Sequence, residues 1–284
     1  MKFPPFAYRT PASVAEAVEM LASDPQAKAL AGGQSLLPLL ALRISQPSTL
    51  VDLGGIAELS GVDAQDGLLS IGAGTTLAEL EDSALVRDRV PLLAKAIREI
   101  AHRPIRNRAT IGGSLAHADP AAELPAVIVA LDATLVAHGP SGERRIDAAD
   151  FFTGAFTTGL GDDEILTGVE FPARNANWSF LEVARRSGDF ALAMVAVGVE
   201  LEGDTCTRPT VVLQGVASGP VRSLAAEQIL ENSVVDDAVA AQAADAATRD
   251  LRPPGDIHAS SDYRKRVAAA LLRRALLEVG RRAQ

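Results

Sequence analysis

Two short glycine-containing segments have the residue types that bind phosphate. Residues 31–35 are Ala-Gly-Gly-Gln-Ser, and residues 110–114 are Thr-Ile-Gly-Gly-Ser. A glycine pair lets the backbone approach a ligand closely, so that successive N–H groups can form a concave anion site before a helix. Ser35 and Ser114 add hydroxyl donors. The two segments together could hold the two phosphates of one dinucleotide, or a pyrophosphate from both sides.

The same glycines could serve a plain turn. A single Gly-Gly-Ser is more often a simple strand-to-helix turn, but the repetition favours a ligand site. The chain has no Gly-Lys-Ser/Thr, so the Walker pattern is absent, and residues 72–77 lack the third small residue of a Rossmann fingerprint. Neither Ser35 nor Ser114 lies in a Gly-X-Ser-X-Gly elbow, which argues against a hydrolase nucleophile.

The composition excludes several classes of protein. The lone Cys206 permits no internal disulfide, no iron–sulfur cluster and no ordinary zinc site on this chain. Any redox chemistry therefore needs an organic cofactor or other chains. The net charge of −9 and the scarcity of aromatic residues argue against nucleic-acid binding. Residues 1–6 lack a signal-peptide pattern and no 18-residue apolar run exists, so we expect no membrane span and a cytoplasmic protein.

The elements that would position the glycine segments can be read from the apolar spacing. Ser13 with Glu16, and Thr76 with Glu79, each predict a capping box at the start of a helix. Both glycine segments are expected to follow a short strand and to run into a helix. The further elements expected in this half are strands at 27–31, 51–53, 68–71 and 133–138, and helices at 91–100 and 123–131.

The composition changes near residues 171–177, where a polar stretch with proline and asparagine predicts a linker. Short turns beyond it, such as 202–204, favour an antiparallel sheet. The order of mixed elements, then strands, then helices indicates two α+β units rather than one doubly wound sheet. The expected strands are 178–184, 191–201 and 210–216, and the expected helices are 223–230, 236–248 and 261–282.

The chain resembles the FAD-binding subunits of molybdenum hydroxylases, the family of the carbon-monoxide and xanthine dehydrogenases. Essentially the whole chain takes part, with the motifs in the same order. They are the two glycine segments, Asp-Pro-Ala-Ala-Glu-Leu-Pro at 119–125, Asp-Phe-Phe-Thr-Gly at 150–154, Asp-Glu-Ile-Leu at 163–166, Ala-Arg-Arg-Ser-Gly-Asp-Phe-Ala at 184–191 and Asp-Ile-His-Ala-Ser-Ser-Asp-Tyr-Arg at 256–264.

The resemblance implies an α+β fold in two domains. Residues 1–174 would form a two-part FAD-binding domain of the PCMH (vanillyl-alcohol-oxidase-like) type. Residues 175–284 would form a small domain like the C-terminal domain of the CO-dehydrogenase flavoprotein, with a three-stranded antiparallel sheet and helices.

The resemblance also implies where FAD binds. The two glycine segments would hold the pyrophosphate and nearby hydroxyls, Glu123 the polyol, the Leu166 backbone the flavin ring, and Phe190 would cover the isoalloxazine. His117 could donate to the cofactor, although a structural role is equally open. The cofactor-binding residues expected are Ala31, Gly32, Gly33, Gln34, Ser35, Leu36, Thr110, Ile111, Gly112, Gly113, Ser114, His117, Asp119, Glu123, Leu166 and Phe190.

Three positions depart from the family. Ser114 stands where many members have Asn, Phe190 replaces a Tyr, and Glu182 stands near where several relatives carry Lys. The basic run from Arg98 to Arg108 is either a solvated face or a surface that attracts a partner or the pyrophosphate. The basic C-terminal stretch, which ends at Arg282, is expected to be an amphipathic packing helix, and Cys206 a bystander.

The function implied is electron transfer through FAD in a molybdenum hydroxylase complex, given by the resemblance as a heterohexamer. A small subunit would carry [2Fe–2S] clusters, a large subunit the molybdenum cofactor, and NAD⁺, a quinone or another compound would be the acceptor. No catalytic residue or metal is expected on this chain. A stand-alone flavin oxidoreductase and a non-enzymatic assembly module are the alternatives. The substrate, among CO, purines and N-heteroaromatics, would bind the molybdenum subunit.

Overall fold

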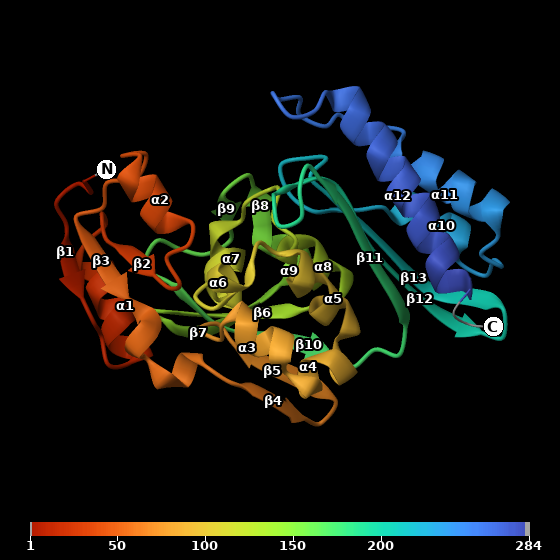
Figure 1. Ribbon diagram of the computed structural model, residues 1–284. Coiled ribbons are helices and arrows are strands. Elements are labelled where there is room, and N and C mark those ends of the chain that lie inside the picture. The colour runs from red at the N-terminus through yellow and green to blue at the C-terminus, as the bar shows by residue number, and fades with distance from the viewer. Residues whose placement is uncertain (1, 282–284) are drawn as a thin grey trace.

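The computed structural model describes residues 2–281, which form three larger sheets with helices packed against them (Figure 1). The N-terminal sheet is parallel, in the order β1-β3-β2. Its elements are β1 (Ala7–Arg9), α1 (Val14–Ser23), β2 (Lys28–Leu30), α2 (Leu36–Ala41) and β3 (Thr49–Asp52), followed by the short 3₁₀ turns η1 (Leu53–Gly55) and η2 (Ala57–Leu59).

The first helix shows how closely local sequence determines the fold. Ser13 caps α1 by accepting the N–H of Glu16, and the predicted apolar stripe along the helix is buried. The predicted capping box is only half formed, because the Glu16 carboxylate accepts the N–H of Ala12 instead of that of Ser13. The complete box occurs at Thr76 and Glu79, as predicted.

The central sheet is antiparallel, in the order β4-β5-β10-β6-β7, and helices from the same part of the chain cover it (Figure 1). Its strands are β4 (Val62–Gln65), β5 (Leu68–Gly72), β6 (Thr134–Gly139), β7 (Gly142–Asp147) and β10 (Ile165–Pro172), with β8 (Phe152–Gly154) and β9 (Thr157–Thr158) forming a separate hairpin. The helices are α3 (Leu77–Asp82), α4 (Ala84–Arg89), α5 (Pro91–Glu99), α6 (Arg103–Arg106), α7 (Ile111–His117), α8 (Leu124–Ala130) and α9 (Ala148–Phe151).

The C-terminal part is an antiparallel sheet, in the order β11-β12-β13-β14, with three helices on one face (Figure 1). The three expected strands are present, and a two-residue strand extends the edge. The elements are β11 (Asn177–Ala184), β12 (Ala191–Glu202), β13 (Thr205–Gln214), β14 (Val221–Arg222), α10 (Leu224–Leu230), α11 (Asp237–Thr248) and α12 (Ser261–Arg281). Arg282, expected at the end of the last helix, lies outside the described residues.

The other face of the C-terminal sheet packs against α5 and α8. Every residue of α8 is buried, and Met194 and Val212 of the sheet belong to the same hydrophobic cluster as α8. The two parts of the chain therefore share one core. The α+β fold with a small C-terminal domain is confirmed, whereas the division between residues 174 and 175 stays a prediction.

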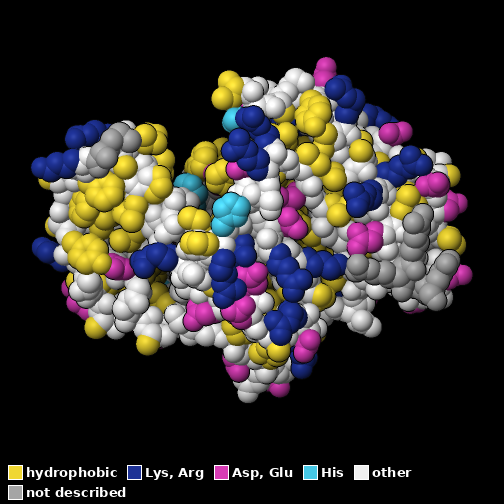
Figure 2. Space-filling model, in the orientation of Figure 1, with side chains coloured by type: hydrophobic (Ala, Val, Ile, Leu, Met, Phe, Trp, Pro, Cys, Tyr) yellow, Lys and Arg dark blue, Asp and Glu magenta, His cyan; other side chains and the backbone are white. Residues whose placement is uncertain are grey.

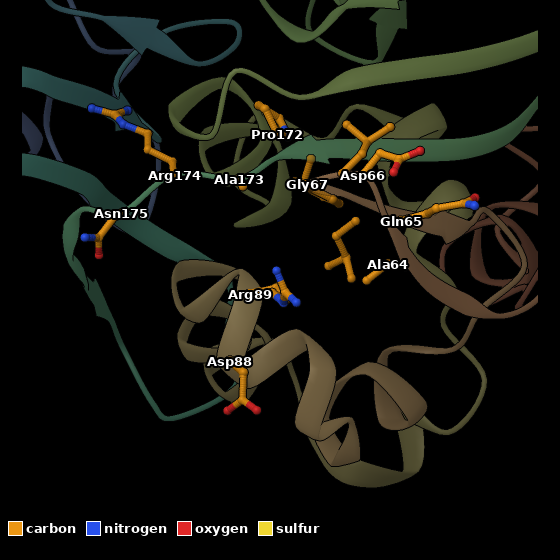
Figure 3. Close-up of a pocket in the computed structure, with 13 residues that line it drawn as sticks. Ala64, Gln65, Asp66, Gly67, Asp88, Arg89, Pro172, Ala173, Arg174 and Asn175 are labelled. Atoms are coloured by element: carbon orange, nitrogen blue, oxygen red, sulfur yellow. The ribbon is translucent and has the colours of Figure 1, made fainter.

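The polar stretch between the two parts is firmly held. Arg174 donates to Glu200 and Thr210, at 2.9 and 2.7 Å, and its guanidinium lies 4.9 Å from the ring centroid of Trp178. A hollow of about 420 Å³ lies beside this stretch, between the β4–β5 hairpin and the end of α4. In Figure 3, Arg89 points into this hollow and Arg174 turns away from it. None of the predicted cofactor residues lines it.

Replacing Thr76 with alanine is expected to lower stability by about 1 kcal/mol. The Thr76 hydroxyl accepts the N–H of Glu79, and the Glu79 carboxylate accepts the N–H of Thr76 in return. The substitution therefore leaves the Glu79 N–H, a donor at the helix end, without its partner. Urea unfolding followed by circular dichroism measures this loss. An unchanged free energy of unfolding would show that the box adds nothing.

Candidate functional site

The two glycine segments, 79 positions apart from Gly33 to Gly112, lie against each other. A Cβ built on Gly32 would stand 1.9 Å from the carbonyl oxygen of Arg108, and one built on Gly113 would stand 3.1 Å from the Cβ of Ala31. The two segments therefore meet, as binding of one shared ligand requires. Figure 2 shows that the surface is hollowed between the N-terminal part and the central body.

The first segment offers unpaired donors. Gly33 has φ +73°, a left-handed conformation that turns the chain from β2 into α2. Within residues 2–281, the backbone N–H groups of Gly33, Gln34, Ser35 and Leu36 donate to no acceptor of the protein. The Gln34 side chain donates back to the Gly32 carbonyl and helps to hold the turn. Four successive free N–H groups are the form of an anion cradle.

The second segment differs from the expectation. It follows the short helix α6 rather than a strand, and its glycines lie in the first turn of α7. The N–H groups here are already satisfied. Ile111 donates to Thr75 at 3.1 Å, Gly112 donates to Ala73 at 2.8 Å, and Gly113 and Ser114 donate to Thr110. The prediction of a second set of free donors is wrong, because these N–H groups already bond their neighbours.

The glycines of the second segment serve close packing instead. A Cβ on Gly112 would stand 2.4 Å from the Cβ of Ala73, so the turn at residues 72–75 can only approach α7 where a side chain is missing. Thr110 and Thr76 form an isolated bridge at the same place. The second segment, packed on the turn at residues 72–75, thus forms the surface that the first segment contacts.

The arginines between Arg98 and Arg108 have three different environments. Two form ion pairs, one is exposed to solvent, and Arg108 lies at the first glycine segment. Arg106 is buried and forms two hydrogen bonds with the Glu81 carboxylate, at 3.0 and 3.1 Å, while Arg103 bonds Glu81 and Asp82. Arg98 is exposed, as a solvated face predicts. The run is no continuous cationic patch, because two of its arginines are paired with carboxylates. Figure 2 shows basic and acidic side chains mixed on this face of the central body. The structural ion pairs could not be identified from the run alone, since their acidic partners lie more than twenty residues earlier.

Arg108 has the position of a ligand-binding cation. It lines a hollow of about 260 Å³ together with residues of the first glycine segment, Tyr8 and Asp52. The Tyr8 hydroxyl donates to the Asp52 carboxylate across this hollow. Of the four residues with free N–H groups, Gly33 lines the same hollow. An arginine next to such a donor is a favourable environment for a phosphate.

Leu166 and His117 lie around the second segment. Leu166 is buried in β10, and the carbonyl of the next residue, Thr167, accepts the N–H of Ala73, which also contacts Gly112. His117 ends α7, and its ring lies 5.2 Å from that of Phe156. Burial lowers the pKa of His117 despite the nearby Asp119, so the imidazole is mainly neutral at pH 7.

Asp119 and Glu123 lie where α7 passes into α8. Asp119 accepts the N–H of Ala121 at 2.8 Å and fixes this turn. Glu123 is 4% exposed, and burial, with the charge of Glu182 next, raises the pKa of its carboxyl to about 8. Burial, followed by the charge of Glu99, likewise raises the pKa of Glu182 to about 7. The sequence singled out Glu182 only as a departure from the family, with no sign that it faces Glu123.

Phe190 lies in the loop between β11 and β12, and its side chain is 62% exposed. The loop contacts the central part, since a Cβ on Gly188 would stand 2.8 Å from the His102 ring and 3.0 Å from the Ala101 carbonyl. Residues 101–102 lead through α6 into the second glycine segment. An exposed aromatic ring in a loop that contacts this part of the chain is able to cover a bound planar group.

The arrangement fits FAD. A cradle of four free N–H groups with Arg108 beside it suits a pyrophosphate. The buried acceptors at Glu123 suit hydroxyl donors, and an exposed aromatic ring lies in the adjoining loop. Among the residues described, no group of three His, Cys, Asp or Glu side chains could hold a metal ion. None of the described helices is long and apolar enough to cross a bilayer.

Comparison with known proteins identifies the family. Residues 4–174 match the sequence model described as the FAD binding domain in molybdopterin dehydrogenase, and residues 178–279 match the CO dehydrogenase flavoprotein C-terminal domain. The medium subunit of nicotine 6-hydroxylase from Paenarthrobacter nicotinovorans is 39% identical, over 99% of this chain and 100% of the relative. The carbon monoxide dehydrogenase medium chain of Hydrogenophaga pseudoflava is 38% identical, over 96% of each chain.

The solved structures agree. A chain of quinoline 2-oxidoreductase from Pseudomonas putida 86 superposes with a TM-score of 0.97 at 42% identity, over 100% of this chain and 99% of the other. The chain therefore belongs to the FAD-binding subunits of the molybdenum hydroxylases, the family of the carbon-monoxide and xanthine dehydrogenases. Within that family it is the medium subunit of a multi-subunit oxidoreductase with small and large subunits.

The comparisons do not favour the two alternatives, a stand-alone flavin oxidoreductase and an assembly module. The relatives match along nearly their whole length and are named as subunits of dehydrogenases or hydroxylases. Partner subunits in this family carry the iron–sulfur clusters and the molybdenum cofactor. The roles of the individual cofactor-binding residues stay predictions.

Proposed function

We propose that this chain holds FAD between the two glycine segments and passes electrons from [2Fe–2S] clusters of a small subunit to an external acceptor such as NAD⁺ or a quinone. When bound, FAD supplies the reversible electron transfer. The observation that carries the proposal is the row of four free N–H groups at residues 33–36, which begins at the hollow that Gly33 and Arg108 line together. A cytoplasmic location and a division after residue 174 belong to the same proposal.

The residues of this chain would bind and orient the cofactor. The N–H groups of the first segment and Arg108 would hold the pyrophosphate, with the Ser35 hydroxyl as a further donor. Thr110 and the glycines after it would hold the second segment at the right distance from the first. Glu123 would accept hydrogen bonds from the polyol, and Phe190 would exclude water from one face of the ring.

The substrate of the complex belongs to the large molybdenum subunit in this proposal. We propose an N-heteroaromatic compound, because relatives that match over nearly the whole chain include nicotine 6-hydroxylase and quinoline 2-oxidoreductase. Relatives named for glyceraldehyde and carbon monoxide also match over nearly the whole chain.

Titration of the purified chain with FAD, followed by flavin fluorescence, tests the proposal. We expect one FAD per chain and quenched fluorescence, and co-expression with the small and large subunits should yield a single complex. Alanine in place of Arg108 should weaken FAD binding about tenfold, the loss typical of one charged hydrogen-bonding group. A chain that stays colourless with excess FAD and with its partner subunits would contradict the function.

A further inference from the structure

A row of three side chains crosses the C-terminal sheet on the face turned toward the rest of the chain. Glu182 of β11 pairs with Met194 of β12, and Met194 pairs with Gln214 of β13. Residues directly opposite one another in antiparallel strands point to the same face. Met194 belongs to the core shared with α8, so the whole row faces the seam between the two parts of the chain.

Glu123 lies on the other side of this seam, at the start of α8. The connection is direct, because the Gln214 amide donates to the carbonyl of Pro120 at 2.9 Å, three residues before Glu123. The row from Glu182 through Met194 to Gln214 therefore reaches the turn that leads to Glu123, which places both carboxyl groups at this seam. In agreement with this placement, the charge of Glu182 raises the pKa of Glu123. They belong to different parts of the chain and meet only because the sheet packs on α8.

This seam has more acceptors than donors. Among the described residues, Glu182 Oε2 and Gln214 Oε1 are buried and accept no hydrogen bond. The charged groups that act on the pair are Asp119 from the turn before α8 and Glu99 from α5, both acidic. Of the basic residues on the elements around the pair, Lys95 of α5 donates to the Trp178 carbonyl, and Arg185, which follows β11, bonds His258.

Glu123 is buried, and Glu182 is half-buried with its Oε2 atom enclosed. Two carboxylates in such a place repel each other and lose hydration, and both effects weaken when one of them takes up a proton. We propose that Glu123 and Glu182 share one proton across the seam in the FAD-free chain, and that the pair releases it to solvent when FAD binds. The O–H bond of the carboxylic acid breaks, a buffer base takes the proton, and no electron moves. This inference rests on the proposed function, because hydroxyl groups of the cofactor would replace the shared proton as donors.

Calorimetry of FAD binding at pH 7.5, in two buffers with different enthalpies of ionisation, measures the proton count. We expect the wild type to release a substantial fraction of one proton per FAD, and the double variant Glu123→Gln, Glu182→Gln to release none. Glu202→Gln, an exposed residue at the end of β12, is the control for loss of a carboxylate and should behave as the wild type. FAD binding without proton release by the wild type overturns the proposal and leaves FAD binding itself intact.

The shared proton has a second signature that needs no FAD. Infrared spectra of the free chain at pH 7 should contain the C=O stretch of a protonated carboxylic acid, present in the wild type and the control and lost in the double variant. Its absence from the wild type would also overturn the proposal. A chain that shows this band but binds no FAD would contradict the proposed function and the release step, while leaving the shared proton established.

The pH dependence of stability is a third measurement. The ordinary pKa of a Glu carboxyl is 4.5, and the pKa of Glu123 in the folded chain is raised to about 8, so the folded chain holds more protons between these values. Stability should therefore fall as the pH rises from about 5.5 to 8.5. The melting temperature of the wild type is expected to drop several degrees more over this range than that of the double variant. An equal drop in the melting temperatures of the wild type and the double variant would contradict the proposal that this pair holds a proton.

Discussion

Replacing Gly32 with alanine should abolish tight FAD binding and lower the free energy of unfolding by about 3 kcal/mol, the upper end of the cost of overpacking. The added Cβ would stand 1.9 Å from the carbonyl oxygen of Arg108 and 2.9 Å from the Cα of Ala109. Both are backbone atoms, so no side-chain rotation can relieve the clash. The two glycine segments would have to separate.

Separation would open the cradle as well as weaken the packing. If the same loss of about 3 kcal/mol appeared in binding, the affinity for FAD would fall about 100-fold. Gly55→Ala is the matched control, because a Cβ there meets no atom within 4 Å. Chemical unfolding and flavin fluorescence measure the two effects. A Gly32→Ala chain that binds FAD as tightly as the Gly55→Ala chain would show that the segments do not need this contact.

Replacing Glu81 with glutamine should cost about 3 kcal/mol, because it leaves the buried guanidinium of Arg106 without its counter-charge. Arg106 also donates to the carbonyls of Ile100 and Ala101, so it ties the carboxylate of α3 to the segment that leads into the second glycine segment. The melting temperature should fall by roughly 6–10 °C. FAD binding should weaken too, since this segment presents the Arg108 backbone to Gly32.

Asp82→Asn is the matched control. Asp82 also pairs with Arg103, but its side chain is 64% exposed, where an ion pair contributes little. Acid titration gives a second measurement. Burial opposes ionisation of Glu81, but the hydrogen bonds from Arg106 and Arg103 outweigh it and hold the pKa of Glu81 below its usual value. The stabilisation is therefore present above the ordinary pKa of a Glu and is lost as the pH falls through the lowered one. Equal melting temperatures of the Glu81→Gln and Asp82→Asn variants would show that the buried ion pair does not stabilise the fold.

Local patterns predicted the elements well. Examples are the cap at Ser13, the capping box at Thr76 and the long apolar strand around residue 195. Each depends on the types and spacing of a few residues that are close in the sequence. The two glycine segments were recognised because their residue types are unusual. The spacing did not show whether the N–H groups of these segments are free or already hydrogen-bonded. That depends on whether a carbonyl from a distant part of the chain, such as that of Ala73, lies within hydrogen-bonding distance.

Two side-chain pairs that the sequence did not predict join distant parts of the chain. Arg106 bonds Glu81, 25 positions earlier, and the charge of Glu182, 59 positions after Glu123, raises the pKa of Glu123. Single charged residues have no period, so nothing in the local sequence indicates a partner. The resemblance to the family placed Glu123 near the cofactor, but only the packing of the sheet on α8 shows that a second carboxyl lies opposite.

The core that α8 shares with the C-terminal sheet has a consequence for how such chains can vary. Met194 and Val212 fill space that α8 leaves, so each part completes the interior of the other. A C-terminal part taken from another chain would have to bring side chains that match this helix. A chimera of two relatives joined at residue 174 would therefore be stable only if its two parts matched in shape where they pack together. For this reason we expect the two parts to evolve together as one chain.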